Sequence, residues 1–194
     1  MLELIQRLDN LSLLYIQEHM RIAALNSPII FLGKLGNLGL FWIILAIILL
    51  CIPKTRKMGV LALCSLLACY LVNNIILKNL IARPRPYTQL ETLVMLIKCP
   101  SDASFPSGHA CSSFACSGAL IRSAHGTAKI ALIPALLLAL CIALSRLYVG
   151  VHYPSDVLAG SLIGLIGSGL IVRYLSKPYE YLCAVINQRH LRNR

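Results

Sequence analysis

Five apolar stretches, each close to the length of a membrane-spanning helix, occupy most of this 194-residue chain. An α-helix needs about 20 apolar residues to cross the hydrocarbon core of a bilayer. The stretches cover residues 29–52, 59–77, 107–123, 130–147 and 154–174. We therefore expect an all-α fold, an integral membrane helical bundle with five to six transmembrane helices.

The composition agrees with a membrane protein. Apolar residues make up 58% of the chain and charged residues only 13%, against roughly a quarter in soluble proteins. Most of the eight cysteines lie in apolar stretches, where cysteine behaves as a small hydrophobic residue. There is no Cys-x-x-Cys pair, so we expect neither a disulfide framework nor a zinc site.

The first 27 residues have the pattern of an amphipathic helix. Apolar residues recur with helical spacing on one side, and five charged residues make a membrane span unfavourable. We expect this segment, residues 1–27, to lie flat at the membrane interface and to end at Asn26-Ser27-Pro28. Whether it crosses instead, as a sixth span, stays open at this point.

The positive charges are distributed unevenly between the two sides of the membrane. If the spans alternate in direction, one side holds ten basic residues and one acid, and the other holds eight basic residues and six acids. The positive-inside rule places the first side in the cytoplasm. The net charge of +11 is then mostly a topology signal, and we expect no nucleic-acid partner. Residues 28–176 would form the transmembrane domain, and residues 177–194 a basic cytoplasmic tail.

Three short polar segments interrupt the apolar pattern. They are KNLIARPRP at residues 78–86, PSGH at 106–109 and SRLYVGVHYPSD at 145–156. The predicted spans bring all three to one membrane face, the non-cytoplasmic one. The 35 residues between His109 and Ser145 suffice for one helix down, a turn and one helix back.

The residue types in these segments suit a phosphate group. Lys78, Arg85 and Arg146 can neutralise its charge, the arginines as bidentate donors. A helix that starts near Ser107 would direct backbone N–H groups and the positive end of its dipole at the phosphate. Gly108 would allow close approach of the backbone, and the Ser107 hydroxyl would add a donor.

Two histidines can divide a phosphoryl transfer between attack and protonation. Asp156 follows His152 by four residues and could hold one ring nitrogen while the other attacks. No carboxylate near in sequence serves His109, which favours His109 as the acid. On the residues alone this assignment is a preference.

The three segments resemble the signature of the type 2 phosphatidic acid phosphatase superfamily, K-x6-R-P, P-S-G-H and S-R-x5-H-x3-D. All three blocks are complete and in order, which is far more specific than one short motif. A second Arg-Pro pair begins at Arg83, but the spacing from Lys78 selects Arg85; Arg83 could still assist phosphate binding.

The resemblance implies a metal-independent lipid phosphatase without cofactors. His152 would form a phosphohistidine, Asp156 would orient it, and His109 would protonate the leaving group and help activate water. The phosphate-binding residues would be Lys78, Arg85, Ser107, Gly108 and Arg146. The partners would be the bilayer and a lipid phosphate, with undecaprenyl diphosphate first, then phosphatidylglycerophosphate or phosphatidic acid. The expected location is the cell membrane, as in a bacterial plasma membrane, with the site on the non-cytoplasmic face.

Two other functions remain open at this stage. A phosphotransferase would pass the phosphoryl group to an acceptor other than water. A non-catalytic lipid transporter would not need every catalytic position, yet each one is present. The 19 residues between Pro86 and Pro106 leave little room for an elaborate lid. The roles of Glu91 and Asp102 in that segment, and the oligomeric state, are not determined by the sequence.

Overall fold

The computed structural model describes residues 2–192, and this part of the chain is helical without strands. The helices are α1 (Leu2–Tyr15), α2 (Ala23–Leu35), α3 (Leu40–Cys51), α4 (Arg56–Tyr70), α5 (Lys78–Ile81), α6 (Gly108–Ser123), α7 (Ala128–Ala131), α8 (Ile133–Tyr148) and α9 (Pro154–Arg192). Two π-helical segments, η1 (Ile16–Met20) and η3 (Leu71–Leu77), and two short 3-10 helices, η2 (Asn37–Gly39) and η4 (Pro86–Thr88), complete the set. The expectation of an all-α membrane protein is confirmed.

Helix α6 is the centre of the bundle. It packs against α4, α8 and α9, and eleven of its residues are buried. Small residues allow this packing: a Cβ at Gly160 of α9 would lie 2.4 Å from the carbonyl oxygen of Ser107, and one at Gly164 would lie 2.5 Å from that of Cys111. Small residues at such contacts are typical of closely packed helices in membrane proteins.

Within residues 2–192, three helical segments could cross a membrane by length and composition, or four if the bent pair α2–α3 counts as one span. This is fewer than the five to six spans expected. The difference arises at α6, which has 16 residues, about 24 Å of helix, and is too short to count as a span by itself. Helix α6 is surrounded by α4, α8 and α9 instead of being a long apolar helix of its own.

The first expected span is bent rather than continuous. Helices α2 and α3 meet at 47° across the segment Gly36-Asn37-Leu38-Gly39. Leu38 and Gly39 have φ of 53° and 66°, in the left-handed region that ends a helix. The bend directs Asn37 toward the start of α6.

The second expected span also changes its helical type. Helix α4 continues through the π segment η3 into α5, which ends at Ala82 with φ 46°. π segments inside helices are frequent at functional sites. Here the segment contains Asn73, which donates to the Pro106 carbonyl at 3.4 Å, and leads directly to the buried Lys78.

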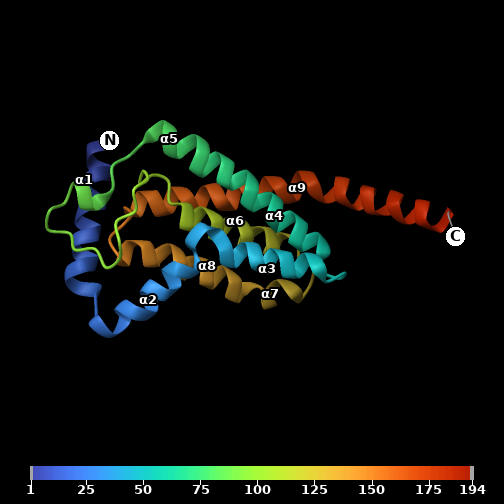
Figure 1. Cartoon of the computed structure of the whole chain (residues 1–194), viewed down its shortest axis with the longest axis horizontal. Coiled ribbons are helices and arrows are strands. Elements are labelled where there is room, and N and C mark those ends of the chain that lie inside the picture. The colour runs from blue at the N-terminus through green and yellow to red at the C-terminus, as the bar shows by residue number, and fades with distance from the viewer. Residues whose placement is uncertain (1, 193–194) are drawn as a thin grey trace.

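The N-terminal helix lies across one end of the bundle, and its axis is not aligned with α4, α6 and α9 (Figure 1). The predicted helix end at 26–28 is wrong: the chain breaks at Arg21 and Ile22, which are extended, and α2 continues through Pro28. Tyr148 fixes the break, because its hydroxyl accepts from the Ile22 N–H at 2.9 Å.

At the opposite end, α9 runs far beyond the bundle (Figure 1). The segment expected as a separate tail is helical as far as Arg192 and continuous with the last span. Lys57 and Glu180 form an ion pair at 2.5 Å that ties this extension to the start of α4.

Candidate active site

His152 lies in the tight connection between α8 and α9. Gly150, with φ 81°, turns the chain back, and Pro154 starts α9. The His152 ring is 2% exposed, its Nδ1 lies 3.6 Å from Asp156 Oδ2, and its Nε2 lies 3.4 Å from Nη1 of Arg85. The first distance is longer than a hydrogen bond, so Asp156 is adjacent to His152 without bonding to it here. Nε2 is the nitrogen that faces the cations.

The surroundings of His152 keep its ring neutral. Burial is the main cause that lowers the pKa of His152, to about 4, and the charges of Arg85 and Arg146 act in the same direction. Asp156 opposes the shift without reversing it. A neutral imidazole has a free lone pair and can act as a nucleophile near pH 7.

Three cations surround the same space. Lys78, Arg85 and Arg146 come from α5, the loop after it and α8, and all three are buried. The carboxylate of Asp102 bonds to Lys78 and, at 2.7 Å, to Nη2 of Arg85, while Nε of Arg85 donates to the Asp102 carbonyl at 2.8 Å. The site therefore already binds an anionic group, supplied by the chain itself.

Asp102 is charged under all ordinary conditions. Its partial burial raises the pKa, but the hydrogen bond and charge of Lys78 and the charge of Arg85 outweigh this and lower the pKa to about 2. The carboxylate contacts two of the groups that a phosphate would contact.

His109 is at the start of α6, opposite the bend between α2 and α3. Its Nε2 lies 3.0 Å from Oδ1 of Asn37. Because an amide oxygen only accepts, Nε2 carries a proton in this arrangement. A Cβ at Gly36 would lie 2.7 Å from the His109 ring, so glycine is required for this approach.

Ser107 and Gly108 form the beginning of α6. The Ser107 hydroxyl caps the helix by accepting from Ala110 N–H at 3.5 Å, and the Ser107 N–H donates to the Asp156 carbonyl at 3.0 Å. Gly108 lines the central cavity, whereas Ser107 does not. In this state, Ser107 holds α6 against α9.

A cavity of about 710 Å³ joins these groups. At one end it is lined by Lys78, Arg85, His109, Arg146 and His152. The rest of its wall is mostly apolar and comes from the bend and from α3 and α4, through Leu38, Ile43, Leu63, Leu66, Leu67 and Tyr70. The shape suits a molecule with an anionic head and a long apolar chain.

The structure thus gathers seven of the eight predicted site residues around one cavity or directly behind it, and uses Ser107 as the cap of α6 beside them. No group of three or more potential metal ligands occurs in the described part of the chain. Sequence reasoning missed Asn37, because nothing in an apolar stretch marks one amide as a partner of a distant histidine. The sequence analysis named Asp102 and Arg83, but it did not predict which residues their side chains contact.

Comparison with known proteins identifies the family. The model of the PAP2 superfamily matches residues 59–180, which is more than half of the chain and includes all three motifs. The chain belongs to the PAP2 superfamily. The family resemblance predicted from the motifs is confirmed.

PAP2 relatives and structures agree with this assignment. The "Undecaprenyl-diphosphatase" of Sulfolobus acidocaldarius is 32% identical over 155 residues, covering 80% of this chain and 73% of that protein. The "Undecaprenyl-diphosphatase BcrC" of Bacillus subtilis is 30% identical over 177 residues, covering 86% of each. A crystal structure of a PAP2-type phosphatidylglycerolphosphate phosphatase from Bacillus subtilis superposes with a TM-score of 0.70 at 28% identity, over 89% of this chain and 87% of that one. This PAP2 protein is a membrane lipid phosphatase, a hydrolase of phosphate esters.

Proposed function

We propose that this PAP2 phosphatase removes the terminal phosphate from a long-chain lipid diphosphate, with undecaprenyl diphosphate as the first candidate substrate. The observation that carries the proposal is the cavity, which has cations and two histidines at one end and apolar walls from α3 and α4 along the rest. Two of the relatives carry the name undecaprenyl-diphosphatase. Phosphatidylglycerophosphate and phosphatidic acid are the next candidates.

The proposed binding mode places the terminal phosphate among Lys78, Arg85 and Arg146. The Gly108 N–H at the start of α6 would add a donor, together with the positive end of the helix dipole. The phosphate would displace the Asp102 carboxylate from Lys78 and Arg85. The lipid chain would lie along the apolar wall.

In the first chemical step, Nε2 of His152 attacks phosphorus and the bond to the leaving oxygen breaks. Asp156 stabilises the charge that develops on the His152 ring, since Oδ2 lies near Nδ1. His109, in its doubly protonated form, donates its Nε2 proton to the departing lipid phosphate oxygen and becomes a neutral imidazole. The products are a phosphohistidine and the lipid with one phosphate fewer.

In the second step, His109, now without that proton, accepts one from a water molecule. The water oxygen bonds to phosphorus as the bond to His152 breaks, which releases inorganic phosphate and restores both histidines. Asn37 would hold the His109 ring before the reaction, because its Oδ1 accepts from Nε2, and the leaving oxygen would then replace Asn37 as the acceptor of that proton.

We also propose that the site opens to the non-cytoplasmic side of the cell membrane. The support is the charge distribution, in which the basic excess lies at the end of the bundle opposite the site. A carrier lipid used outside the cytoplasm would then be dephosphorylated on the side where it is released.

The test is release of inorganic phosphate by the purified protein in detergent, from undecaprenyl diphosphate, phosphatidylglycerophosphate and phosphatidic acid. We expect the diphosphate to give the highest kcat/KM and activity to persist with a chelator. His152→Ala should lower turnover by more than roughly a thousandfold. Substantial turnover by His152→Ala would rule out the nucleophile, and phosphate release that requires an acceptor alcohol would indicate a transferase.

A further inference from the structure

Arg83 is oriented toward the catalytic carboxylate rather than toward the substrate cavity. Among the described residues that line the cavity, Lys78 and Arg85 are present and Arg83 is not. Nη1 of Arg83 donates to Asp156 Oδ1 at 2.6 Å and to Ser155 Oγ at 2.8 Å. The suggestion that Arg83 assists phosphate binding therefore has no support in its position.

The two oxygens of Asp156 have different partners. Oδ2 is the oxygen near His152, and it accepts from the Ser104 hydroxyl at 2.5 Å and from the Tyr153 N–H at 2.9 Å. Oδ1 accepts from Arg83. Since the side chain is completely buried, donors at both oxygens fix the plane of the carboxylate. Without Arg83, Oδ1 would lose its charged donor and the carboxylate could rotate away from His152.

Arg83 is in turn held by the N-terminal helix. Nη2 donates to Asp9 Oδ2 at 2.8 Å and to Gln6 Oε1 at 2.6 Å, both on α1. The guanidinium also lies 4.0 Å above the ring of Tyr153. Asp9 is 3% exposed, and a buried carboxylate requires a charged or hydrogen-bonding partner. Asp9, Arg83 and Asp156 form one continuous chain of charges.

Asp9 also contacts the start of α9 directly. Its Oδ1 accepts from the Ser155 N–H at 3.0 Å, and its Oδ2 bonds to the Ser155 hydroxyl. The first N–H groups of a helix have no partner within the helix, so a side chain from α1 satisfies one of them. The carboxylate of α1 thus holds both the helix that carries Asp156 and the arginine that bonds to it.

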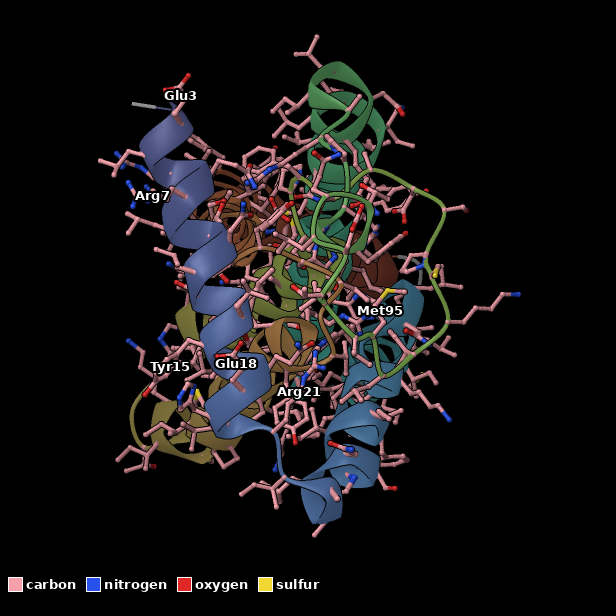
Figure 2. The ribbon with its side chains drawn as sticks, turned by 90° about the vertical axis from the view of Figure 1, so that its left-hand side faces the viewer. Glu3, Arg7, Tyr15, Glu18, Arg21 and Met95 are labelled. Carbon is pink, nitrogen blue, oxygen red and sulfur yellow. The ribbon has the colours of Figure 1, made fainter. Side chains whose placement is uncertain are left out.

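The other side of α1 faces outward. Leu4, Leu8, Leu11 and Tyr15 are each more than half exposed. Figure 2 looks onto this end of the molecule, with α1 in front and Arg7 at its outer edge. An amphipathic helix with an exposed apolar side is suited to the membrane interface. Its inner side, with Asp9 and Leu13, is buried against the rest of the molecule.

We propose that Arg83 is a positioning residue for Asp156 and that Asp9 holds Arg83 in place. Through Asp9, the N-terminal helix then helps to set the geometry of the active site. The inference rests on the proposed roles of His152 and Asp156. Arg83 and Asp9 do not touch the substrate. Their loss should therefore lower kcat and leave KM nearly unchanged.

The test compares Arg83→Gln, Arg83→Lys, Asp9→Asn and the double variant Asp9→Asn/Arg83→Gln, with Arg7→Gln on the exposed side of α1 as the control. Phosphate release should show kcat reduced roughly 10- to 100-fold in Arg83→Gln, with KM within about threefold. Arg83→Lys should recover part of the loss. The double variant should be no worse than Arg83→Gln within about twofold, because the two side chains act in series. Arg7→Gln should behave as the wild type.

Hydrogen exchange followed by mass spectrometry supplies a readout that does not depend on activity. Asp9→Asn should increase exchange both in α1 and in the first turn of α9, and Arg7→Gln should change neither. A higher KM with unchanged kcat in Arg83→Gln would make Arg83 a substrate ligand and overturn the inference. Unchanged exchange at the start of α9 in Asp9→Asn would overturn it as well. If His152→Ala stayed active while these exchange changes occurred, the proposed mechanism would fail but the link between α1 and Asp156 would stand.

Discussion

At the scale of single residues, the three cations of the site differ in how their charge is compensated. Lys78 and Arg85 share the carboxylate of Asp102. Arg146 has no ion pair among the described residues, and its Nε has no hydrogen-bond partner there. A phosphate can therefore bind Arg146 at once, but it must compete with Asp102 for the other two cations.

Replacing Asp102 by Asn should strengthen phosphate binding. The variant removes the competing charge, so KM for the lipid substrate and the inhibition constant of inorganic phosphate should both fall, roughly threefold to tenfold. Because the pKa of Asp102 is lowered to about 2, the difference from the wild type should not depend on pH above about pH 4. Glu91→Gln, an exposed acid in the same segment, is the matched control. A higher KM in Asp102→Asn would contradict competition and make Asp102 part of substrate binding.

The pKa of His152 predicts the acid limit of the reaction. As the proposed nucleophile, the ring can attack only when neutral, and its pKa of about 4 lies below the ordinary value of 6.5. kcat/KM should therefore fall on the acid side near pH 4, and not near pH 6.5 as for a solvent-exposed histidine. The measurement is kcat/KM between pH 4 and 8, with the substrate titrated separately in the same micelles to account for its own ionisation. A loss of activity centred near pH 6.5 that substrate titration does not explain would refute a buried, neutral nucleophile.

At the scale of elements, the contact between α6 and α9 brings the two halves of the site together. Helix α6 carries His109, and α9 begins just after His152 and carries Asp156. Their distance is set where Gly160 lies against the Ser107 carbonyl. Any side chain at this position must push the two helices apart, and the two histidines with them.

Gly160→Ala should consequently impair both stability and turnover. The added Cβ would lie 2.4 Å from a backbone oxygen, an overlap that costs about 1–3 kcal/mol. We expect a lower Tm in detergent and a kcat reduced by roughly tenfold or more. Gly169→Ala is the control on the same helix, because its nearest contact would be Arg122 Nε at 3.5 Å. Equal behaviour of the two variants would show that the close approach at Gly160 is not required.

At the scale of the whole molecule, the site and the basic excess lie at opposite ends. The cavity, α1 and the segment between η4 and α6 are at one end, and the extension of α9 projects from the other (Figure 1). An α9 of 39 residues is about 58 Å long, nearly twice the thickness of a hydrocarbon core. The extension must therefore leave the membrane on the side opposite the site.

The proposed orientation can be tested with two native cysteines. Cys99 is exposed in the segment before α6, and Cys183 lies in the extension of α9. Single-cysteine variants in sealed, right-side-out vesicles should react with a membrane-impermeant maleimide at Cys99 and not at Cys183. Permeabilising the vesicles should then allow Cys183 to react, which controls for its accessibility. The reverse labelling pattern would place the site in the cytoplasm.

Particular residues show how far prediction from the sequence could reach. The sequence predicts that Lys78, Arg85, His109 and His152 lie at one end of the bundle. It can do so because span lengths and motif spacing are local properties of the chain. The bend at residues 36–39 was not predicted, because a bent helix pair and a straight helix can have the same apolar composition. For the same reason the contact between Asn37 and His109 could not be foreseen from residues 72 positions apart.

The sequence by itself determined the membrane class, the helical architecture and the chemistry of the motifs, because hydrophobic length and residue type act locally. Only the tertiary structure decided which carboxylate each cation contacts. Asp102 bonds to Lys78 and Arg85, while Asp9 from the N-terminal helix and Asp156 share Arg83. A charge that is buried must find its partner in space, and that partner depends on how helices distant in the sequence pack together.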